Sequence, residues 1–209
     1  MSMTLGKRRM QGHRYDGETF ENLDLSSLDA FESVWVGCTF TNCDMTLGNM
    51  QRVELSGCTF QDCDMRAVNF MGAKIRQVRF DSCDLRQSAF AGVTPLDRVV
   101  FQSCRLQYAS FYNSTARDSE FLEANLHGAD LRFIEATRMK YAGSNLWGAY
   151  VQLGCQFLRS EFDERQCDLF TGMVARRQPN EEKRKLLTDI AGISAKVVDR
   201  LMATDEGVA

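Results

Sequence analysis

Residues 37–45 read Gly-Cys-Thr-Phe-Thr-Asn-Cys-Asp-Met, and residues 57–65 read Gly-Cys-Thr-Phe-Gln-Asp-Cys-Asp-Met. Within each copy a large apolar residue falls at every fifth position, with a small residue two places before it. A five-residue period fits neither a helix nor a plain strand. Continued in both directions at steps of about twenty residues, the pattern gives one aromatic column: Phe20, Phe40, Phe60, Phe80, Phe101, Phe121, Tyr141 and Phe162. We therefore expect a repeat structure in which each coil uses about twenty residues.

This pattern resembles the pentapeptide-repeat family, in which a small residue, Asp or Asn, and Leu or Phe are followed by two polar residues. The resemblance covers about residues 18–170. It implies an all-β solenoid, a right-handed quadrilateral parallel β-helix of about seven coils in which four pentapeptides make one square coil. Coils stack at about 4.8 Å, so the rod from Phe20 to Phe162 is roughly 34 Å long. Single extra residues at Val93–Asp97 and between Val151 and Phe162 are interpreted as bulges.

Each of the four expected sides has its own column of inward residues. The first side carries the aromatic column. The second carries Leu25, Met45, Met65, Leu85, Leu106, Leu126 and Leu146. The third carries Ala30, Met50, Phe70, Phe90, Phe111, Leu131 and Val151. The fourth carries Trp35, Leu55, Ile75, Leu96, Ala116, Ala136 and Phe157.

The sequence divides into three segments: a polar, basic lead-in (1–17), the β-helix (18–170) and a C-terminal segment (171–209). Asn180 is a candidate helix N-cap. Apolar residues then recur at helical spacing, which predicts C-terminal α-helices: Leu186, Leu187, Ile190, Ile193, Val197, Val198, Leu201 and Met202. The open end of a β-helix is a bare strand edge, so we expect this segment to cap it or to form a homodimer. A DNA-binding helix-turn-helix between Leu187 and Leu201 is the alternative.

Composition favours a cytoplasmic protein that binds no metal. The chain has 209 residues, of which 44% are hydrophobic. It contains no apolar run of transmembrane length and no secretory signal at the N-terminus. Seven of the eight cysteines occupy the small inward position and are expected to be reduced: Cys38, Cys43, Cys58, Cys63, Cys83, Cys104 and Cys155. Their Cys-x4-Cys spacing differs from that of zinc ligands.

The sequence offers no catalytic residues and no cofactor site. The two histidines, His13 and His127, have no candidate nucleophile at a meaningful spacing, and His127 falls at an outward repeat position. No glycine-rich phosphate loop or paired metal motif occurs. We therefore expect a protein that is not an enzyme.

Charge is the informative surface feature. Residues 20–170 contain 14 basic and 20 acidic residues. The acids of the first side include Glu21, Asp62, Asp81, Glu120, Glu123, Glu161, Asp163 and Glu164, and the second side carries Asp24, Asp44, Asp64 and Asp84. The fourth side is basic, with Lys74, Arg76, Arg98, Arg117, Arg138 and Arg159. This predicts a rod with electrostatic polarity around its circumference.

The chain also resembles the quinolone-resistance pentapeptide proteins of the Qnr and MfpA type. That resemblance implies a DNA mimic that binds a type II topoisomerase, either DNA gyrase or topoisomerase IV, with no direct contact to nucleic acid or membrane. The expected partner-binding residues are Glu21, Asp24, Asp44, Asp62, Asp64, Asp81, Asp84, Glu120 and Glu123. An alternative interpretation is that the aspartates of the second side serve only the geometry of the repeat.

A second hypothesis is an interaction scaffold unconnected with topoisomerases, such as a bacterial effector or a secretion-associated protein. Exposed apolar residues on the third side favour a partner surface. They are Met71, Tyr112, Phe133, Tyr150 and Leu153, with Tyr108 and Trp147 nearby. The protein's own C-terminal helices or a second copy could equally cover this surface.

Overall fold

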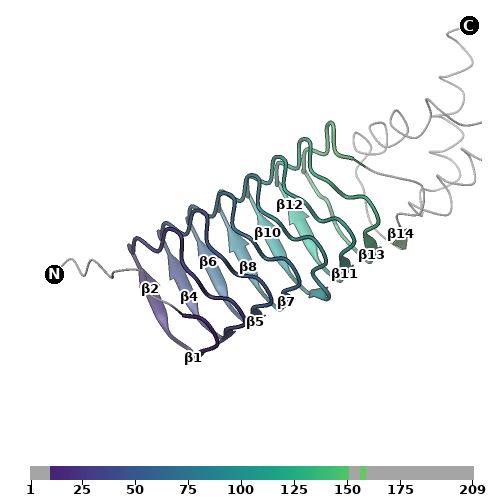
Figure 1. The fold of residues 1–209 in the computed structure, drawn as a ribbon. Helices are drawn as coiled ribbons and strands as arrows, with labels where there is room; N and C mark the ends of the chain where they lie inside the picture. Colours follow the sequence, from purple (N-terminus) through teal and green to yellow (C-terminus); the bar gives the residue numbers. More distant parts are fainter. Residues whose placement is uncertain (1–9, 151–155, 159–209) are drawn as a thin grey trace, which may run out of the picture.

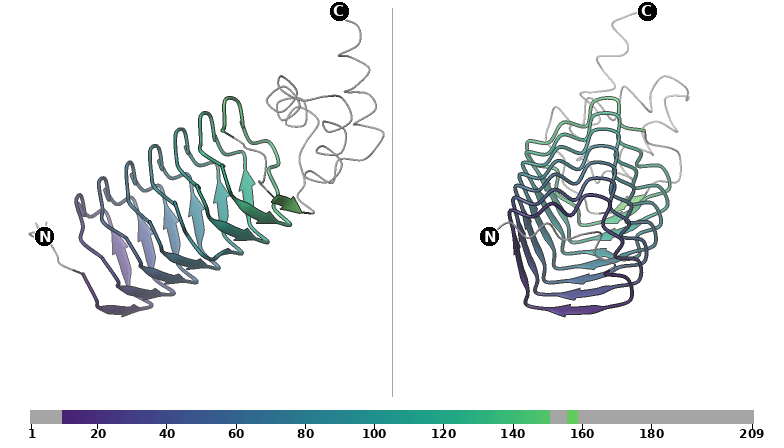
Figure 2. Two further views of the ribbon diagram at one scale, coloured as in Figure 1. Left: turned by 45° about the vertical axis from the view of Figure 1, so that its right-hand side comes forward. Right: turned by 60° about the vertical axis from the view of Figure 1, so that its left-hand side comes forward.

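The computed structural model describes residues 10–150 and 156–158, which form an elongated solenoid of about six turns. Figure 1 shows the coils stacked in chain order from one end to the other, and the right-hand view of Figure 2 shows their four-sided outline. The described elements are strands of two or three residues, and every pairing between them is parallel. The four-sided parallel β-helix expected from the repeat is confirmed for these residues.

Two adjacent sides are continuous sheets. The six-stranded sheet of the first side contains β2 (Thr19–Glu21), β4 (Thr39–Thr41), β6 (Thr59–Gln61), β8 (Arg79–Asp81), β10 (Val100–Gln102) and β12 (Glu120–Leu122). The eight-stranded sheet of the fourth side contains β1 (Arg14–Asp16), β3 (Val34–Val36), β5 (Glu54–Ser56), β7 (Lys74–Arg76), β9 (Leu96–Asp97), β11 (Thr115–Arg117), β13 (Glu135–Thr137) and β14 (Gln156–Leu158). The strands pair so that each inward residue lies beside its equivalent in the next coil, as Phe40 lies beside Phe20 and Phe60.

The second and third sides are ladders of single bridges. On the second side Asp44 bridges to Asp24 and to Asp64, and on the third side Asn49 bridges to Asp29 and to Asn69. Each of these sides therefore repeats once per coil, like the two sheets.

The corners explain why the repeat unit is five residues long. At corner after corner, the second residue beyond the inward one lies in the left-handed region, with φ of 62° at Gly37, 51° at Asn42 and 52° at Asp62. Glycine tolerates this conformation without cost, and Asn and Asp adopt it more readily than other residues. Three extended residues followed by this turn change the chain direction once per pentapeptide.

Two stacks of aromatic rings fill the interior. On the first side the ring centroids of Phe40 and Phe60 are 4.8 Å apart and those of Phe60 and Phe80 are 5.0 Å apart, with nearly parallel planes. On the opposite, third side Phe70 and Phe90 stack at 4.7 Å. The two stacks meet edge to face, with 79° between the planes of Phe70 and Phe80. Both offset-stacked and T-shaped pairs are favourable arrangements for aromatic rings.

The cysteines do more than fill space beside these rings. All six described cysteines are buried and free, as expected: Cys38, Cys43, Cys58, Cys63, Cys83 and Cys104. The thiol of Cys63 donates to the carbonyl of Phe40 at 3.5 Å, one coil earlier, and that of Cys83 donates to Phe60 at 3.4 Å. Ser144 makes the same contact to Phe121 at 2.9 Å. The small inward position therefore also supplies a hydrogen-bond donor between coils.

The first extra residue leaves the register intact. Leu96 pairs with Ile75 in the coil before and with Ala116 in the coil after, although 21 positions rather than 20 separate Ile75 from Leu96. The additional residue is accommodated just before β9, where the Thr94–Pro95 peptide bond is cis.

The solenoid begins earlier than the boundary expected at residue 18. Strand β1 pairs with β3, so the fourth side already includes Arg14–Asp16, and Met10 is buried in the core. Met10 and Tyr15 precede Phe20 at steps of five, so the five-residue spacing of the repeat already extends to Met10 in the sequence. At the other end, Val151, Cys155, Phe162, Cys167 and the expected helices of 171–209 lie outside the described residues.

Candidate functional site

The aspartates of the second side form the expected ladder, and their carboxylates hold the backbone turn. Asp24 accepts the backbone N–H of Ser26 at 3.0 Å, and Asp44 accepts that of Thr46 at 2.9 Å. Asn69 makes the same contact on the third side, to the N–H of Met71 at 2.9 Å. Asp24 and Asp44 therefore contribute to the geometry of the repeat. Since an Asn can also make the contact, the geometry alone does not require a charge.

Arginines neutralise the later part of this ladder. Arg66 pairs with Asp64 at 2.6 Å, and Arg86 pairs with Asp84 at 2.6 Å while Arg105 lies 3.8 Å from the same carboxylate. The four aspartates of the second side are therefore not equally available, because Asp64 and Asp84 are paired with cations of this chain. The two residues that flank an inward residue both point outward, so Asp64 and Arg66 on either side of Met65 were the sequence signal for this pairing.

On the first side, too, some acidic residues are paired with cations and others are not. Asp81 pairs with Arg79 at 2.9 Å, and Glu120 pairs with Lys140 at 2.7 Å. Among the residues that the structure describes, Glu21, Asp62 and Glu123 take part in no ion pair. The remaining acids expected on this side, Glu161, Asp163 and Glu164, lie outside the described residues.

Hydrogen bonds keep one of the unpaired ladder carboxylates ionised. The side chain and the backbone N–H of Ser26 both donate to Asp24, which lowers the pKa of that carboxyl below its ordinary value. Asp44 forms no ion pair among residues 10–150, although it interacts electrostatically with Arg66. The acids of the predicted site that form no ion pair in the described chain are therefore Glu21, Asp24, Asp44, Asp62 and Glu123.

Charge is also divided along the axis of the rod. Residues 10–64 contain 10 acidic and 2 basic side chains, whereas residues 65–150 contain 8 acidic and 11 basic ones. Because each coil follows the last in chain order, these two segments of the sequence become successive parts of the solenoid (Figure 1). The coils up to residue 64 are therefore strongly negative, whereas the described coils after them carry a small excess of basic residues.

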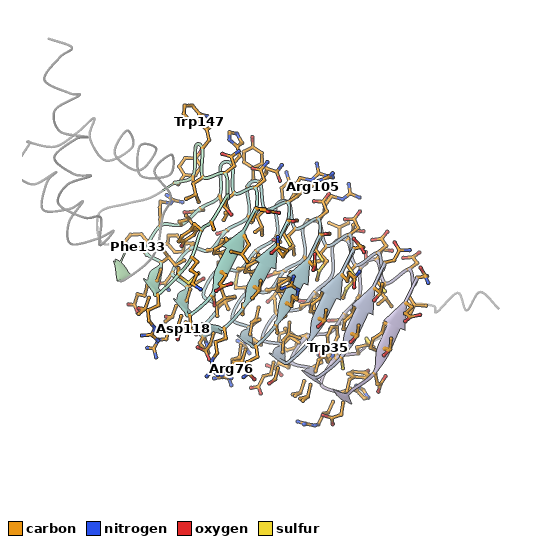
Figure 3. The ribbon with its side chains drawn as sticks, turned by 180° about the vertical axis from the view of Figure 1, so that it is seen from behind. Trp35, Arg76, Arg105, Asp118, Phe133 and Trp147 are labelled. Carbon is orange, nitrogen blue, oxygen red and sulfur yellow. The ribbon has the colours of Figure 1, made fainter. Side chains whose placement is uncertain are left out.

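The basic fourth side is partly neutralised by pairs that link successive coils. Lys74 contacts Glu54 at 2.6 Å, and Arg138 contacts Asp118 at 2.5 Å. Arg76 and Arg117 form no ion pair with any described residue. Figure 3 shows Arg76 and Asp118 along one edge of the solenoid and Arg105 and Trp147 along the opposite edge.

Within the described part of the chain, no three His, Cys, Asp or Glu side chains converge as a possible metal site. A search of the same residues for a helix long and apolar enough to span a membrane finds none.

Comparison with family models agrees with the repeat that the structure displays. The model described as "Pentapeptide repeat region" matches residues 33–95, and the model described as "Pentapeptide repeats (8 copies)" matches residues 96–132. The chain is a pentapeptide-repeat protein. No curated protein matches its sequence.

Several solved structures align with this pentapeptide-repeat protein at low similarity. One is QnrB1, a plasmid-mediated fluoroquinolone resistance protein, with 17% identity, 84% of this chain and 94% of that chain covered, and a TM-score of 0.36. Another is HetL of the cyanobacterium Nostoc sp. strain PCC 7120, involved in heterocyst differentiation regulation, with 17% identity, coverage of 75% and 90%, and a TM-score of 0.32. A pentapeptide repeat protein from the thylakoid lumen of Arabidopsis thaliana has 18% identity, coverage of 78% of each chain, and a TM-score of 0.23. These likenesses assign no function.

Proposed function

We propose that this pentapeptide-repeat protein is a non-enzymatic, cytoplasmic DNA mimic that binds a type II topoisomerase, DNA gyrase or topoisomerase IV, and modulates its response to inhibitors. The observation that carries the proposal is a set of carboxylates that form no ion pair within the described chain, on two adjacent sides of the N-terminal half: Glu21, Asp24, Asp44 and Asp62. A surface that imitates DNA offers fixed negative charges to a basic groove.

The rigidity of the solenoid supports this proposal. Asp24 and Asp44 are held by hydrogen bonds to the backbone, and their bridges fix them one coil apart. Charges on a preorganised scaffold lose little conformational entropy when a partner binds. The acids of the C-terminal half contribute less, because Asp84 and Glu120 are already paired with cations of this chain.

A supercoiling assay with purified gyrase, with and without a quinolone, tests the proposal. The wild-type protein should inhibit supercoiling or relieve quinolone poisoning, and its effect should fall steeply as salt is raised. Absence of both effects at micromolar protein would refute a role in topoisomerase binding.

Charge reversal locates the binding surface. Glu21→Lys with Asp62→Lys should abolish the effect on gyrase, since both side chains are exposed, form no ion pair in the described chain and lie outside the aspartate ladder. Glu135→Lys is the matched control for Glu21→Lys alone, because Glu135 is also exposed and forms no ion pair there, but lies on the fourth side. Circular dichroism must first show all variants to be folded. Equal loss in the control would indicate dependence on net charge rather than on this surface.

The competing function is an interaction scaffold, and the exposed aromatic residues of the third side favour it. Tyr108, Trp147 and Tyr150 are each 60% or more exposed. If the acidic variants bind a partner normally, this third side becomes the better candidate interface.

A further inference from the structure

An aromatic surface covers the third side of the solenoid and its corners toward the C-terminal end. This third-side patch consists of Met71, Tyr108, Tyr112, Phe133, Trp147 and Tyr150, and each member is at least 40% exposed. Several large apolar side chains exposed on one side of a protein often mark a contact surface. In Figure 3 its members Trp147 and Phe133 lie in the last described coils, toward opposite edges of the solenoid.

The patch is built so that its rings lie against the coils. The ring of Tyr108 covers Gly128 one coil later, so closely that a Cβ at Gly128 would lie 2.6 Å from it, and His127 packs against Tyr108 at 5.7 Å between ring centroids. Toward the fourth side, Tyr112 and Phe133 meet edge to face at 5.3 Å. These contacts order the rings of Tyr108, Tyr112 and Phe133 before any partner arrives, which reduces the entropy lost on docking.

Electrostatics favours an apolar occupant. The outward positions of the third side between residues 69 and 113 carry no charged residue. Farther along, Asp130 and Arg132 neutralise each other at 2.7 Å, and the guanidinium of Arg132 also lies over the ring of Tyr112. Covering this surface therefore removes little unpaired charge from water, and the main gain is burial of aromatic area.

We propose that the occupant is the C-terminal segment of the same chain, residues 181–202, docked through its apolar residues. That segment carries eight apolar side chains at helical spacing, from Leu186 to Met202. The 22 residues between positions 158 and 181 can span up to about 70 Å, whereas the patch from Met71 to Tyr150 is only about 20 Å long along the axis. Tethering gives such a segment an effective concentration on the order of millimolar, so docking within the chain outcompetes docking of a second copy.

Trp147 is a native probe for this contact. The chain has two tryptophans, of which Trp35 is fully buried and Trp147 is exposed on the solenoid surface. Quenching of fluorescence by acrylamide in the full-length protein therefore reports on Trp147. We expect weak quenching in the wild type, and a several-fold rise in the quenching constant in the full-length variant Leu187→Asp/Ile190→Asp.

Thr188→Asp/Lys196→Asp is the matched control, since it adds the same number of carboxylates at polar positions of the segment and should leave the quenching constant unchanged. The proposal is overturned if wild-type Trp147 is quenched as fully as a free indole, or if the apolar-face variant leaves its protection intact. It is also overturned if protection appears only as protein concentration is raised, because the occupant would then be a second copy. Far-ultraviolet circular dichroism confirms that the solenoid is retained in each variant.

Discussion

At the scale of single residues, the small inward position determines how successive coils are tied together. Cys58 donates its thiol to the carbonyl of Trp35 at 3.3 Å, and Ser114 donates its hydroxyl to that of Phe90 at 2.7 Å. Burial raises the pKa of the Cys58 thiol to about 11. The neutral thiol is therefore the form that the fold requires, and these side chains are poor nucleophiles at neutral pH.

This shift predicts a loss of stability in alkali. The folded-state pKa of Cys58 lies above its unfolded value of 9.0, so its contribution is complete below pH 9 and is lost as pH rises toward about 11. Each such thiol should lower the unfolding free energy by about 1.4 kcal/mol per pH unit within that window. Urea titrations between pH 8 and 11 measure this slope. Cys58→Ser keeps a donor while removing the titration, so an unchanged slope in that variant would contradict the assignment.

At the scale of the repeat element, a pentapeptide combines one inward side chain, one small donor and one outward polar residue that holds the turn. The inward ring of Phe60 stacks on Phe40 and on Phe80 and is fully buried. Gln61, the next residue, is exposed. Adjacent residues such as Phe60 and Gln61 therefore contribute very differently to the stability of the fold.

We predict that Phe60→Ala lowers the unfolding free energy by about 3–5 kcal/mol, because truncating a buried ring removes two stacking contacts and leaves a cavity. Gln61→Ala should change it by less than about 0.5 kcal/mol. Denaturant unfolding of the two variants gives the comparison, and similar losses in both would show that the inward assignment is wrong.

The outward aspartate allows structure and charge to be separated. Asp44→Ala should cost about 1 kcal/mol, since the backbone N–H of Thr46 loses its acceptor. Asp44→Asn should be nearly neutral in stability, because Asn69 makes the same contact elsewhere in the repeat. Under the proposed function, the Asn variant should nevertheless bind gyrase more weakly. Equal stability of the two variants in thermal unfolding would exclude a turn-holding role for Asp44.

At the scale of the whole molecule, the solenoid is one-dimensional: each coil contacts only the coils before and after it. Stability is then close to a sum of coil and interface terms. The coils of β4, β6 and β8 have a described neighbour on both sides, whereas β2 ends its sheet.

Amide hydrogen exchange should therefore be graded along the rod. The amides of Phe60 and Phe80 should exchange most slowly, and those of Phe20 at least ten times faster (about 1.4 kcal/mol in opening free energy), because an end coil can open without breaking two interfaces. Mass spectrometry of peptic fragments resolves these coils. Uniform protection along the rod would instead indicate a single cooperative unit.

The sequence by itself determined the fold, because a side chain that recurs every five residues must face the same interior in each coil. The columns from Phe20 to Tyr141, the free cysteines and the positions of the aspartate ladder all followed from that period. Met10 and Tyr15 continue the same five-residue spacing toward the N-terminus, but the residues around them are polar and basic, which hides the repeat there.

Only the tertiary structure decided which charges remain available to a partner. Whether a carboxylate is neutralised also depends on side chains one coil away, as with Lys140 and Glu120. A tally of charges by side cannot supply those distances. Stacking of the coils converts position in the chain into position along the axis, so the ladder aspartates without an ion pair, Asp24 and Asp44, lie in one half of the rod. Ion pairing depends on the distance between charges in three dimensions, and that distance comes from the folded structure.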